Sequence, residues 1–464
     1  MTAVADTKPF VPYAPTPRAT PAGRLQGLWL LARNPIESWT QAHYTQPILA
    51  GESPLFGYAV VVNHPPAIRR VLVDNAANYE KDPLQLRILK TGSSGGEGLF
   101  TATGDAWKRT RRTLSPLFTP RRVATFAGLM QNNAEARVDR WLKRRPGAIL
   151  EIDREMTGVT YDILSTTLFS DAIAKDSTGF ERALMQYLDA IGRVDPLDVF
   201  NAPAWLPRIA SFRARAPLAF FTQTMMRIVE ERQALIARDN ASAPDDLLTA
   251  LLRASDPETG IGLSTEDVIA NLLTFIVAGH ETTSRALTWT LYLLSQSPEW
   301  RARAEAEAAN ASPDPANWLD EMHTIRAVFE EAMRLYPPAP VLTREAQDFD
   351  RLGETNVPKG ALVIISPWIL HRHKLLWTQP EAFMPERFLP GARDAIDRFA
   401  YLPFGGGARV CIGARFAMLE AVIVLATILR RTRLTLVAGE EPKPLQRITL
   451  RPQGRLAMQV HKIG

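Results

Sequence analysis

The chain of 464 residues contains a single cysteine, Cys411. One thiol cannot form an intrachain disulfide, which excludes the small secreted folds that depend on such bonds. It also excludes an iron–sulfur cluster bound by this chain alone, because several cysteine thiolates hold such clusters. The sequence therefore fits a reducing compartment, and we expect a cytoplasmic protein.

Long hydrophobic runs are also missing. No stretch of about 18 uninterrupted apolar residues occurs, so we expect no membrane span. The first residues lack the basic start and apolar core of a signal peptide. Five prolines between Pro9 and Pro21 instead predict an extended arm over residues 1–24. Neither an internal repeat nor a long linker divides residues 25–464, which are predicted to form a single domain.

Charge of one sign does not dominate, since the formal net charge is +5. Much of the local basicity lies in Trp107–Arg112, which reads Trp-Lys-Arg-Thr-Arg-Arg. A basic run can bind nucleic acid, but no nucleic-acid-binding module accompanies this one, and we expect no such partner. An acidic protein partner or a buried anion explains the run better.

The pattern of apolar residues predicts a mainly α fold with small β-sheets, in the α+β class. Helical periodicity dominates from about residue 104 to residue 335. β-Branched runs predict strands at 58–62 and 360–366, and alternating apolar residues around Pro452–Gly454 predict a terminal hairpin.

The longest predicted helix begins near Ser264, in a capping pattern with Asp267, and ends before Pro298. A length of roughly 50 Å would cross the whole domain. Its apolar centre is interrupted by Gly279-His-Glu-Thr-Thr-Ser284. Buried polar groups are costly without partners, so these residues either bond to neighbouring backbone or line a cavity. Six small or polar residues in succession favour the cavity.

A glycine-rich loop, Phe404-Gly-Gly-Gly-Ala-Arg-Val-Cys411-Ile-Gly413, precedes an apolar helix predicted to start near Ile412. Its glycines permit the backbone to approach a flat ligand closely. A lone cysteine is usually an inert small hydrophobe. Here the helix start favours a thiolate, and Arg409 can pair with an anion. A nucleophilic cysteine would need a histidine base, and the seven histidines form no recognisable pattern.

These motifs resemble those of the cytochrome P450 family. The family's cysteine loop is F-x-x-G-x-R-x-C-x-G, and the chain matches every fixed position from Phe404 to Gly413. Three further matches follow the family's order: Ala278–Thr283 to A-G-x-[DE]-T-[TS], Glu331–Arg334 to E-x-x-R, and Pro385–Phe388 to P-E-R-F. The resemblance spans roughly residues 25–462. It implies a single-domain P450 fold with a long central helix over the haem, and residues 25–464 as the catalytic domain.

The resemblance implies haem b as the cofactor, with Cys411 as the axial ligand to the haem iron. Phe404 would pack on the thiolate side of the haem, next to Gly405. On the opposite side, Thr282 would hold water near dioxygen, and Glu281 would help to supply protons. Alternatively, Thr282 only bonds to a helix carbonyl. Two small residues of the same helix would lie against the cofactor, namely Ala278 and Gly279; His280 occupies the variable motif position and is not expected to be a ligand.

Haem propionates need cationic or hydrogen-bonding partners. By resemblance, the candidates are Trp107, Arg111, Arg344 and Arg409. The remaining basic residues of the run, Lys108, Arg109 and Arg112, would then point elsewhere, either toward an acidic redox partner or simply into solvent.

Two other groups of residues are predicted to be structural. Glu331, Arg334 and Arg387 should form a buried charge cluster. His371-Arg-His373 suggests a metal site, but it is predicted to lie in a surface loop, and we do not expect a metal there.

The implied function is that of a haem-thiolate monooxygenase, which inserts one atom of O2 into an apolar organic substrate. Electrons would come from a separate ferredoxin or flavodoxin and an NAD(P)H-dependent reductase, and we expect a monomer. A peroxide-driven enzyme is one alternative, against which the Glu281–Thr282 pair argues. A haem sensor without turnover is another. The pocket walls are expected at residues 84–100, in the helices around 180–235, at Ala278, at Ala339–Leu342 and near Ile448.

Overall fold

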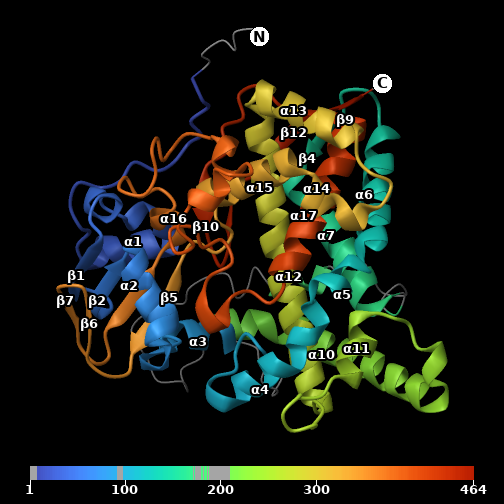
Figure 1. Cartoon of the computed structure of the whole chain (residues 1–464), viewed down its shortest axis with the longest axis horizontal. Helices are drawn as coiled ribbons and strands as arrows, with labels where there is room; N and C mark the ends of the chain where they lie inside the picture. Colours follow the sequence, from blue (N-terminus) through green and yellow to red (C-terminus); the bar gives the residue numbers. More distant parts are fainter. Residues whose placement is uncertain are drawn as a thin grey trace.

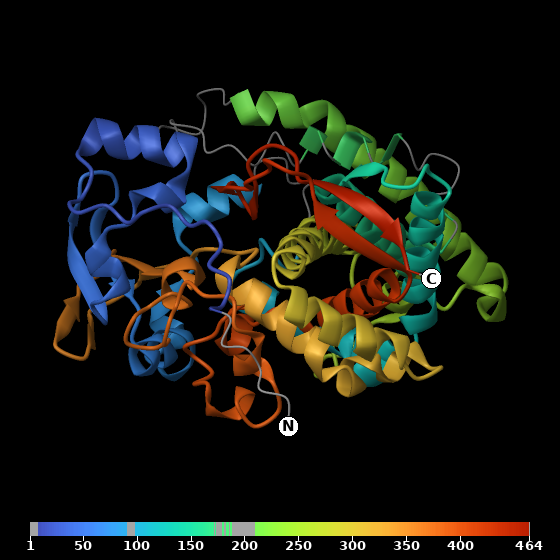
Figure 2. The ribbon, with the colours of Figure 1, turned by 90° about the horizontal axis from the view of Figure 1, so that it is seen from above.

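The structure is a computed structural model that describes residues 8–90, 98–170 and 209–463, with a few positions between 172 and 187. A helix-rich region and a β-rich region lie side by side in it (Figures 1 and 2). The helices are α1 (Arg24–Arg33), α2 (Pro65–Arg69), α3 (Pro83–Lys90), α4 (Gly104–Leu114), α5 (Pro120–Ala124), α6 (Ala127–Leu142), α7 (Ile152–Phe169), α10 (Ile209–Arg238), α11 (Leu247–Arg253), α12 (Thr265–Ser295), α13 (Pro298–Ala309), α14 (Trp318–Glu321), α15 (His323–Leu335), α16 (Pro367–Leu370) and α17 (Ala414–Arg431).

Helix α12 confirms the long helix predicted from the sequence, and it runs through the helix-rich region (Figure 1). The hydroxyl of Ser264 accepts a hydrogen bond from the backbone N–H of Asp267 at 3.1 Å, which is the predicted cap. Most of the residues of α12 are buried against neighbouring helices, α7 and α15 among them. Because most of the helix packs against its neighbours, the residues at its middle that border open space have defined positions inside the protein.

Four small sheets in the part of the chain that the structure describes confirm the predicted α+β class. Their strands are β1 (Ile48–Ser53), β2 (Gly57–Val62), β3 (Tyr79–Glu80), β4 (Ile149–Glu151), β5 (Leu342–Ala346), β6 (Asp350–Leu352), β7 (Thr355–Val357), β8 (Leu362–Ile365), β9 (Thr432–Leu436), β10 (Pro444–Gln446), β11 (Leu450–Pro452) and β12 (Ala457–Lys462). The largest sheet has the order β1-β2-β8-β5-β3, and β2 and β8 within it are parallel. Strands β2 and β8 are the two that the β-branched runs predict.

The predicted terminal hairpin is wrong. Strand β11 pairs with β10, whereas β12 lies between β4 and β9 in a different sheet. The turn at Pro452–Gly454 is present, with a φ of +83° at Gly454, but the strands on its two sides separate. Alternation of apolar residues marks a strand with one buried face and does not identify its partner.

Described residues 8–23 contain neither a helix nor a strand. The carbonyl of Phe10 accepts a hydrogen bond from the N–H of Phe383 at 2.8 Å, and that of Tyr13 accepts one from the hydroxyl of Tyr336 at 2.9 Å. The start of the chain therefore lies along segments that are more than 300 residues away in the sequence. Among the described helices, none combines the length and the apolar character that crossing a membrane requires.

A buried charge cluster links α15 to the long segment that follows α16. The guanidinium of Arg334 donates to the carboxylate of Glu331 at 2.6 and 2.7 Å, and both side chains are 0% exposed. Arg334 also donates to three backbone carbonyls of that segment, those of His371, Pro380 and Ala382. Arg387 Nε lies 3.7 Å from the Glu331 carboxylate. The predicted cluster is thus confirmed.

The prediction that His371–His373 lies in a surface loop is wrong. All three side chains are buried. His371 Nε2 accepts a hydrogen bond from the backbone N–H of Leu402 at 2.8 Å, and Arg372 pairs with Glu381 at 3.0 Å. This segment is polar because it bonds to the surrounding backbone, so its composition resembles that of a surface loop.

Candidate active site

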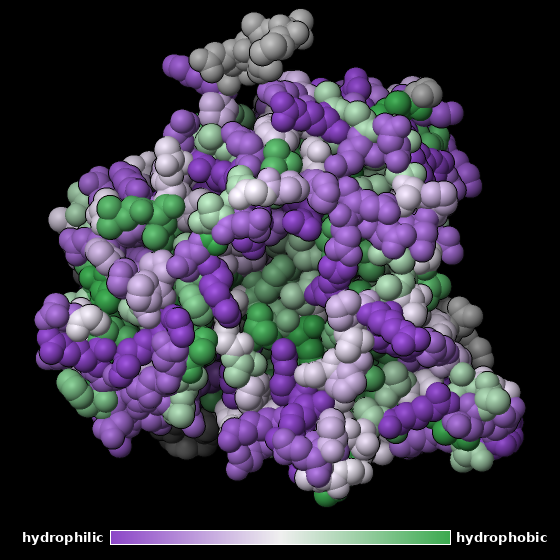
Figure 3. All heavy atoms as spheres, viewed as in Figure 1, coloured by the Kyte–Doolittle hydropathy of each residue, from purple (hydrophilic) through white to green (hydrophobic). Residues whose placement is uncertain are grey.

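A cavity of about 1380 Å³ lies between α12, the cysteine loop and the five-stranded sheet. Every site residue named from the sequence borders it: Trp107, Arg111, Ala278, Gly279, Glu281, Thr282, Arg344, Phe404, Gly405, Arg409 and Cys411. These residues come from four separate parts of the chain, so the fold is what brings them together. On the face that Figure 3 shows, apolar residues lie in a recess near the centre, surrounded by hydrophilic ones.

The cavity wall also includes much of the pocket expected from the sequence. Leu84, Leu99, Ala339, Leu342 and Ile448 all border it. Positions 91–97 and 188–208 of the expected wall lie outside the described residues. In the described part of 209–235, no residue borders the cavity, and the wall there is formed by α7 and α11 instead.

The cysteine loop has a shape that only glycine allows at one position. Gly407 has a φ of +69°, and a Cβ atom added there would lie 1.9 Å from the carbonyl oxygen of Leu72. The loop therefore packs backbone against backbone on the turn that contains Leu72. The backbone N–H of Cys411 donates to the carbonyl of Phe404 at 2.9 Å, which closes the loop on itself before α17 begins at Ala414.

The thiol of Cys411 is exposed to the cavity. Burial of the thiol by the surrounding protein raises its pKa, and the backbone N–H of Gly413 and the charge of Arg111 lower the pKa by less. Arg111 is held there by donating to the carbonyl of Val410 at 2.9 Å. Desolvation of the thiol thus outweighs the contributions of the Gly413 N–H and of Arg111 that favour the thiolate. A metal cation at the sulfur would favour the thiolate.

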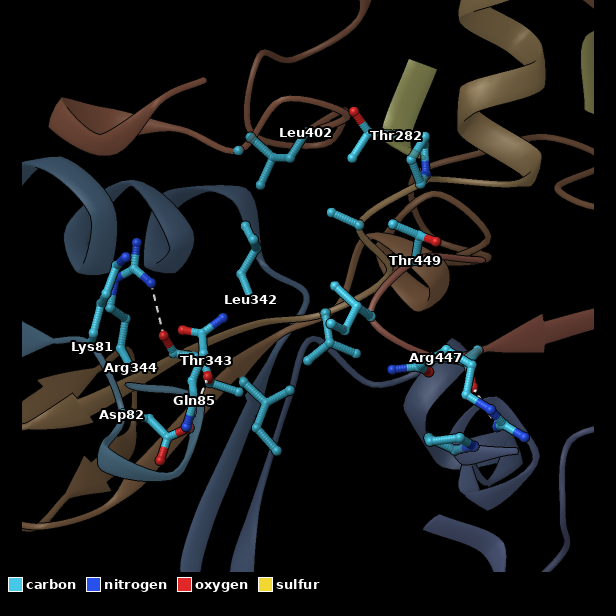
Figure 4. Close-up of a pocket in the computed structure, with 18 of the residues that line it drawn as sticks. Lys81, Asp82, Gln85, Thr282, Leu342, Thr343, Arg344, Leu402, Arg447 and Thr449 are labelled. Atoms are coloured by element: carbon cyan, nitrogen blue, oxygen red, sulfur yellow. Dashed lines mark hydrogen bonds between the residues drawn. The ribbon is translucent and has the colours of Figure 1, made fainter. Parts of the chain in front are cut away.

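Three cationic side chains border the cavity, and none forms a close ion pair with a carboxylate in the described part of the chain: Lys81, Arg344 and Arg409. Burial, together with repulsion from Arg409 and Arg344, lowers the pKa of Lys81 to about 7. Burial and the neighbouring Arg409 lower the pKa of Arg344 to about 10. Like charges that are partly buried close together favour binding of an anionic partner. The group thus fits a ligand that carries carboxylates, and Figure 4 shows Lys81 and Arg344 on one side of the pocket.

The basic run on α4 divides between the cavity and the surface. The guanidinium of Arg409 lies 4.2 Å from the ring centroid of Trp107, so the two flat groups form one wall. For Arg112 the sequence left open an acidic redox partner or solvent, whereas the structure pairs it within the chain, with Asp256 at 2.8 Å and Glu258 at 3.2 Å. This pairing lowers the pKa of Asp256 to about 2, chiefly through the hydrogen bond from Arg112.

Helix α12 supplies the polar side of the cavity. The hydroxyl of Thr282 donates to the carbonyl of Ala278 at 2.7 Å, which is the local bond considered from the sequence. A Cβ at Gly279 would meet Leu164 of α7 at 3.5 Å, an ordinary packing distance. His280 is buried, and burial lowers its pKa to about 3, so the imidazole is neutral.

Glu281 is buried at the edge of the cavity. Its carboxylate accepts a hydrogen bond from the hydroxyl of Thr449 at 2.8 Å and lies 3.7 Å from Arg285. Arg285 in turn pairs with Asp153. Thr449 is 168 residues away in the sequence, and no motif pointed to it.

A sequence profile described as Cytochrome P450 matches residues 38–459. The chain belongs to the cytochrome P450 family. It is therefore an oxidoreductase, a monooxygenase that uses a haem-iron cofactor.

Relatives and solved structures agree with this family. The chain is 34% identical to cyclooctatin synthase of Streptomyces melanosporofaciens over 83% of each chain, and 30% identical to pentalenene oxygenase of Streptomyces avermitilis over 87% of each. The crystal structure of the cytochrome P450DA heme domain superimposes with a TM-score of 0.83 at 25% identity, and the match covers 98% of this chain and 99% of that one.

One further acid of this cytochrome P450 borders the cavity and was not identified from the sequence. Glu420 of α17 is 3% exposed. Burial raises its pKa well above the ordinary value, and a hydrogen bond with Thr283 of α12 lowers it only in part. Its surroundings therefore favour the protonated form of the carboxyl group. Three residues that the sequence did not identify share one property, namely that each interacts at the cavity with a residue distant in the sequence: Lys81, Thr449 and Glu420.

Proposed function

We propose that this cytochrome P450 binds haem b with Cys411 as the axial ligand and hydroxylates an apolar substrate. The supporting observation is that the cavity joins a thiol, a group of partly buried cations without close ion pairs and a polar pair on α12. The overall reaction would be R–H + O2 + 2 e⁻ + 2 H⁺ → R–OH + H2O. Haem ligated by a thiolate supplies the oxygen activation when it is bound.

The propionates of the cofactor would be held by the cations that now repel one another. Arg344, Arg409 and Lys81 offer charged donors at one side of the cavity, and Trp107 and Arg111 border the same region. Two carboxylates would offset much of this charge, and the bound anions would restore the protonated form of Lys81. Phe404 and Gly405 would border the thiolate side.

Two residues of α12 would deliver the protons that the reaction consumes. Glu281 is the ionisable group at the cavity edge, and Thr282 lies next to it with its hydroxyl on the helix carbonyl of Ala278. We propose that Glu281 passes protons toward the reacting oxygen and that Thr282 orders the water that carries them. Ala278 and Gly279 would border the cofactor on this side.

The substrate would be an apolar molecule of the terpene class. Many residues of the cavity wall are apolar, among them Leu84, Val341, Leu342, Ile364 and Ile448. Two relatives are named pentalenene oxygenase and cyclooctat-9-en-7-ol 5-monooxygenase, and their names suggest pentalenene and cyclooctat-9-en-7-ol as the first compounds to test. Titration of the protein with a panel that includes these two compounds would identify a ligand by the spin-state change in the absorption spectrum.

The electrons would come from a separate small acidic protein, a ferredoxin or flavodoxin, and its NAD(P)H-dependent reductase. The exposed Arg109 and Lys108 of α4 lie near the cysteine loop, to which α4 is tied through Arg111 and Val410. Basic residues at this place would attract an acidic partner. The protein would be active as a cytoplasmic monomer.

Cys411→Ser tests the ligand assignment. The wild-type protein, reduced under carbon monoxide, is expected to show the red-shifted Soret band of a thiolate-ligated haem. The serine variant should lose this band because an alcohol does not donate electron density as a thiolate does. Thr288→Val, which changes a buried hydroxyl that bonds only within α12, serves as the control and should keep the band. A serine variant that keeps the band would overturn the assignment.

A further inference from the structure

The carboxylate of Glu281 is fixed by a residue from outside its helix. Thr449 lies between β10 and β11, and its hydroxyl donates to Oε1 of Glu281 at 2.8 Å. Thr449 is 3% exposed and Glu281 is 8% exposed. A hydrogen bond to a charged group in such surroundings is stronger than one in water. It therefore restricts the orientation of the carboxylate.

The backbone around Thr449 is itself tied to the centre of the molecule. Trp289 of α12 donates through Nε1 to the carbonyl of Leu450 at 3.1 Å, and the N–H of Leu450 donates to the carbonyl of Pro338 at 3.1 Å. The carbonyl of Thr449 accepts from the N–H of Arg447 at 2.9 Å, which makes the segment a tight turn. The hydroxyl of Thr449 is thus held at a fixed place relative to α12.

The contacts of Glu281 converge on one of its two oxygens. Arg285 Nη2 lies 3.7 Å from Oε1, the same atom that Thr449 reaches, while Arg285 Nη1 pairs with Asp153. No hydrogen bond from a described residue reaches Oε2. Glu281 therefore has one anchored oxygen and one oxygen without a protein donor, in a residue that borders the cavity.

We propose that Thr449 is a positioning residue, which anchors Oε1 of Glu281 so that Oε2 exchanges protons with the cavity. This inference rests on the proposed role of Glu281. Thr449 and Thr282 lie on the same side of the pocket, opposite Lys81 and Arg344 (Figure 4). An anchored acid delivers a proton along one direction, whereas a freely rotating one spends much of its time turned away. Poor delivery would divert electrons from product to hydrogen peroxide, by O2 + 2 e⁻ + 2 H⁺ → H2O2.

Thr449→Val removes the hydroxyl and keeps the shape of the side chain. The holoenzyme, its redox partners and the panel compound with the largest spin-state change would be used to measure the ratio of product to hydrogen peroxide. We expect the ratio to fall about ten-fold in Thr449→Val, the size that loss of one hydrogen bond to a charged group predicts. Thr449→Ser restores the hydroxyl and should return the ratio to within about two-fold of wild type. The control, Thr288→Val, should not change it, because that hydroxyl bonds only to the carbonyl of Ser284.

A second experiment separates positioning from a substrate contact, because Thr449 also borders the cavity. The dissociation constant of the same compound, from its spin-state titration, should change less than about two-fold in Thr449→Val, since an apolar ligand gains nothing from the hydroxyl. In the Glu281→Gln background, Thr449→Val should cause no further change in the product ratio. The shifts in thermal midpoint of the two single variants should also fail to add in the double variant.

An unchanged product ratio in Thr449→Val, or an additive effect on top of Glu281→Gln, would overturn the proposal. A loss of affinity that accounts for the loss of product would overturn it too, by showing that Thr449 contacts the substrate. If the valine variant does not fold, Thr449→Ala takes its place with the same expectations. A wild-type protein that forms no product would instead contradict the proposed function, so the two failures are distinguishable.

Discussion

Glu420 is a carboxyl group of the cavity wall whose surroundings favour its protonated form. It lies inside the molecule against Thr283, and burial raises its pKa well above the ordinary value. A carboxyl with a raised pKa stabilises the folded state fully below its unfolded pKa of about 4.3, and this contribution is lost as the pH rises. Between that pH and the folded pKa, the folded state binds a proton that the unfolded state has released.

Glu420→Gln should therefore change how stability depends on pH. In the wild type, this proton contributes a slope of up to about 1.4 kcal/mol per pH unit to the free energy of unfolding. Glutamine has a similar shape and no proton to lose, so the variant lacks this slope. We expect the free energy of unfolding of the variant, relative to wild type, to increase from pH 5 to pH 8 in urea titrations. Glu230→Gln, at an exposed position of α10, is the control and should give no such trend. A constant difference between Glu420→Gln and wild type would show that the acid is ionised in the folded state.

Individual residues could be predicted where a short motif contains them. The cysteine loop and the α12 motif identified residues that all border one cavity. Lys81 and Thr449 could not be found in this way, because each acquires its role from a neighbour more than 150 residues away. Single-residue chemistry that depends on such neighbours becomes visible only in the folded chain.

At the scale of elements, the sequence predicts helices and strands better than it predicts their pairing. Helix α12 has a capping serine and a terminating proline, which are local signals. The terminal strands have only an alternating pattern, which is equally compatible with a hairpin and with the two separate sheets that form. The partners of β12 are decided by which sheet edges are available after the helices pack.

The close packing of the cysteine loop against the turn that contains Leu72 can be tested by adding one methyl group. Gly407→Ala would place a Cβ against the backbone carbonyl of Leu72, at a φ of +69° that alanine rarely adopts. The unfavourable φ alone costs roughly 1–2 kcal/mol, and the clash adds to it. We expect a lower thermal midpoint and a lower haem content per protein. The control is Gly128→Ala within α6, where an added Cβ atom would meet no neighbouring atom within 4 Å. Its free energy of unfolding should increase by up to about 1 kcal/mol, because alanine favours the helix more than glycine does. Normal stability of Gly407→Ala would mean that the loop moves away from this turn easily.

At the scale of the whole molecule, the general architecture was predictable, and the way its regions are joined was only partly so. The motif Glu331–Arg334 indicated a buried ion pair, which the structure contains. The three carbonyls that Arg334 also bonds belong to residues 371–382, a segment whose composition had suggested a surface loop. Polar composition does not distinguish a segment that bonds to water from one that bonds to a buried guanidinium.

Arg334→Ala should affect the folding of the entire molecule. The substitution leaves the Glu331 carboxylate buried without its closest cation and removes the donor of three carbonyls, so we expect a loss of roughly 3–5 kcal/mol in the free energy of unfolding. Arg326→Ala is the matched control on the same helix. Arg326 is partly exposed and 3.6 Å from Glu330, a pair that contributes at most about 1 kcal/mol. Urea unfolding and haem content, measured on both variants, compare the two sites. Equal stability of the two variants would mean that the buried network adds no more than a surface ion pair, and that α15 and the segment after α16 are held together by apolar packing.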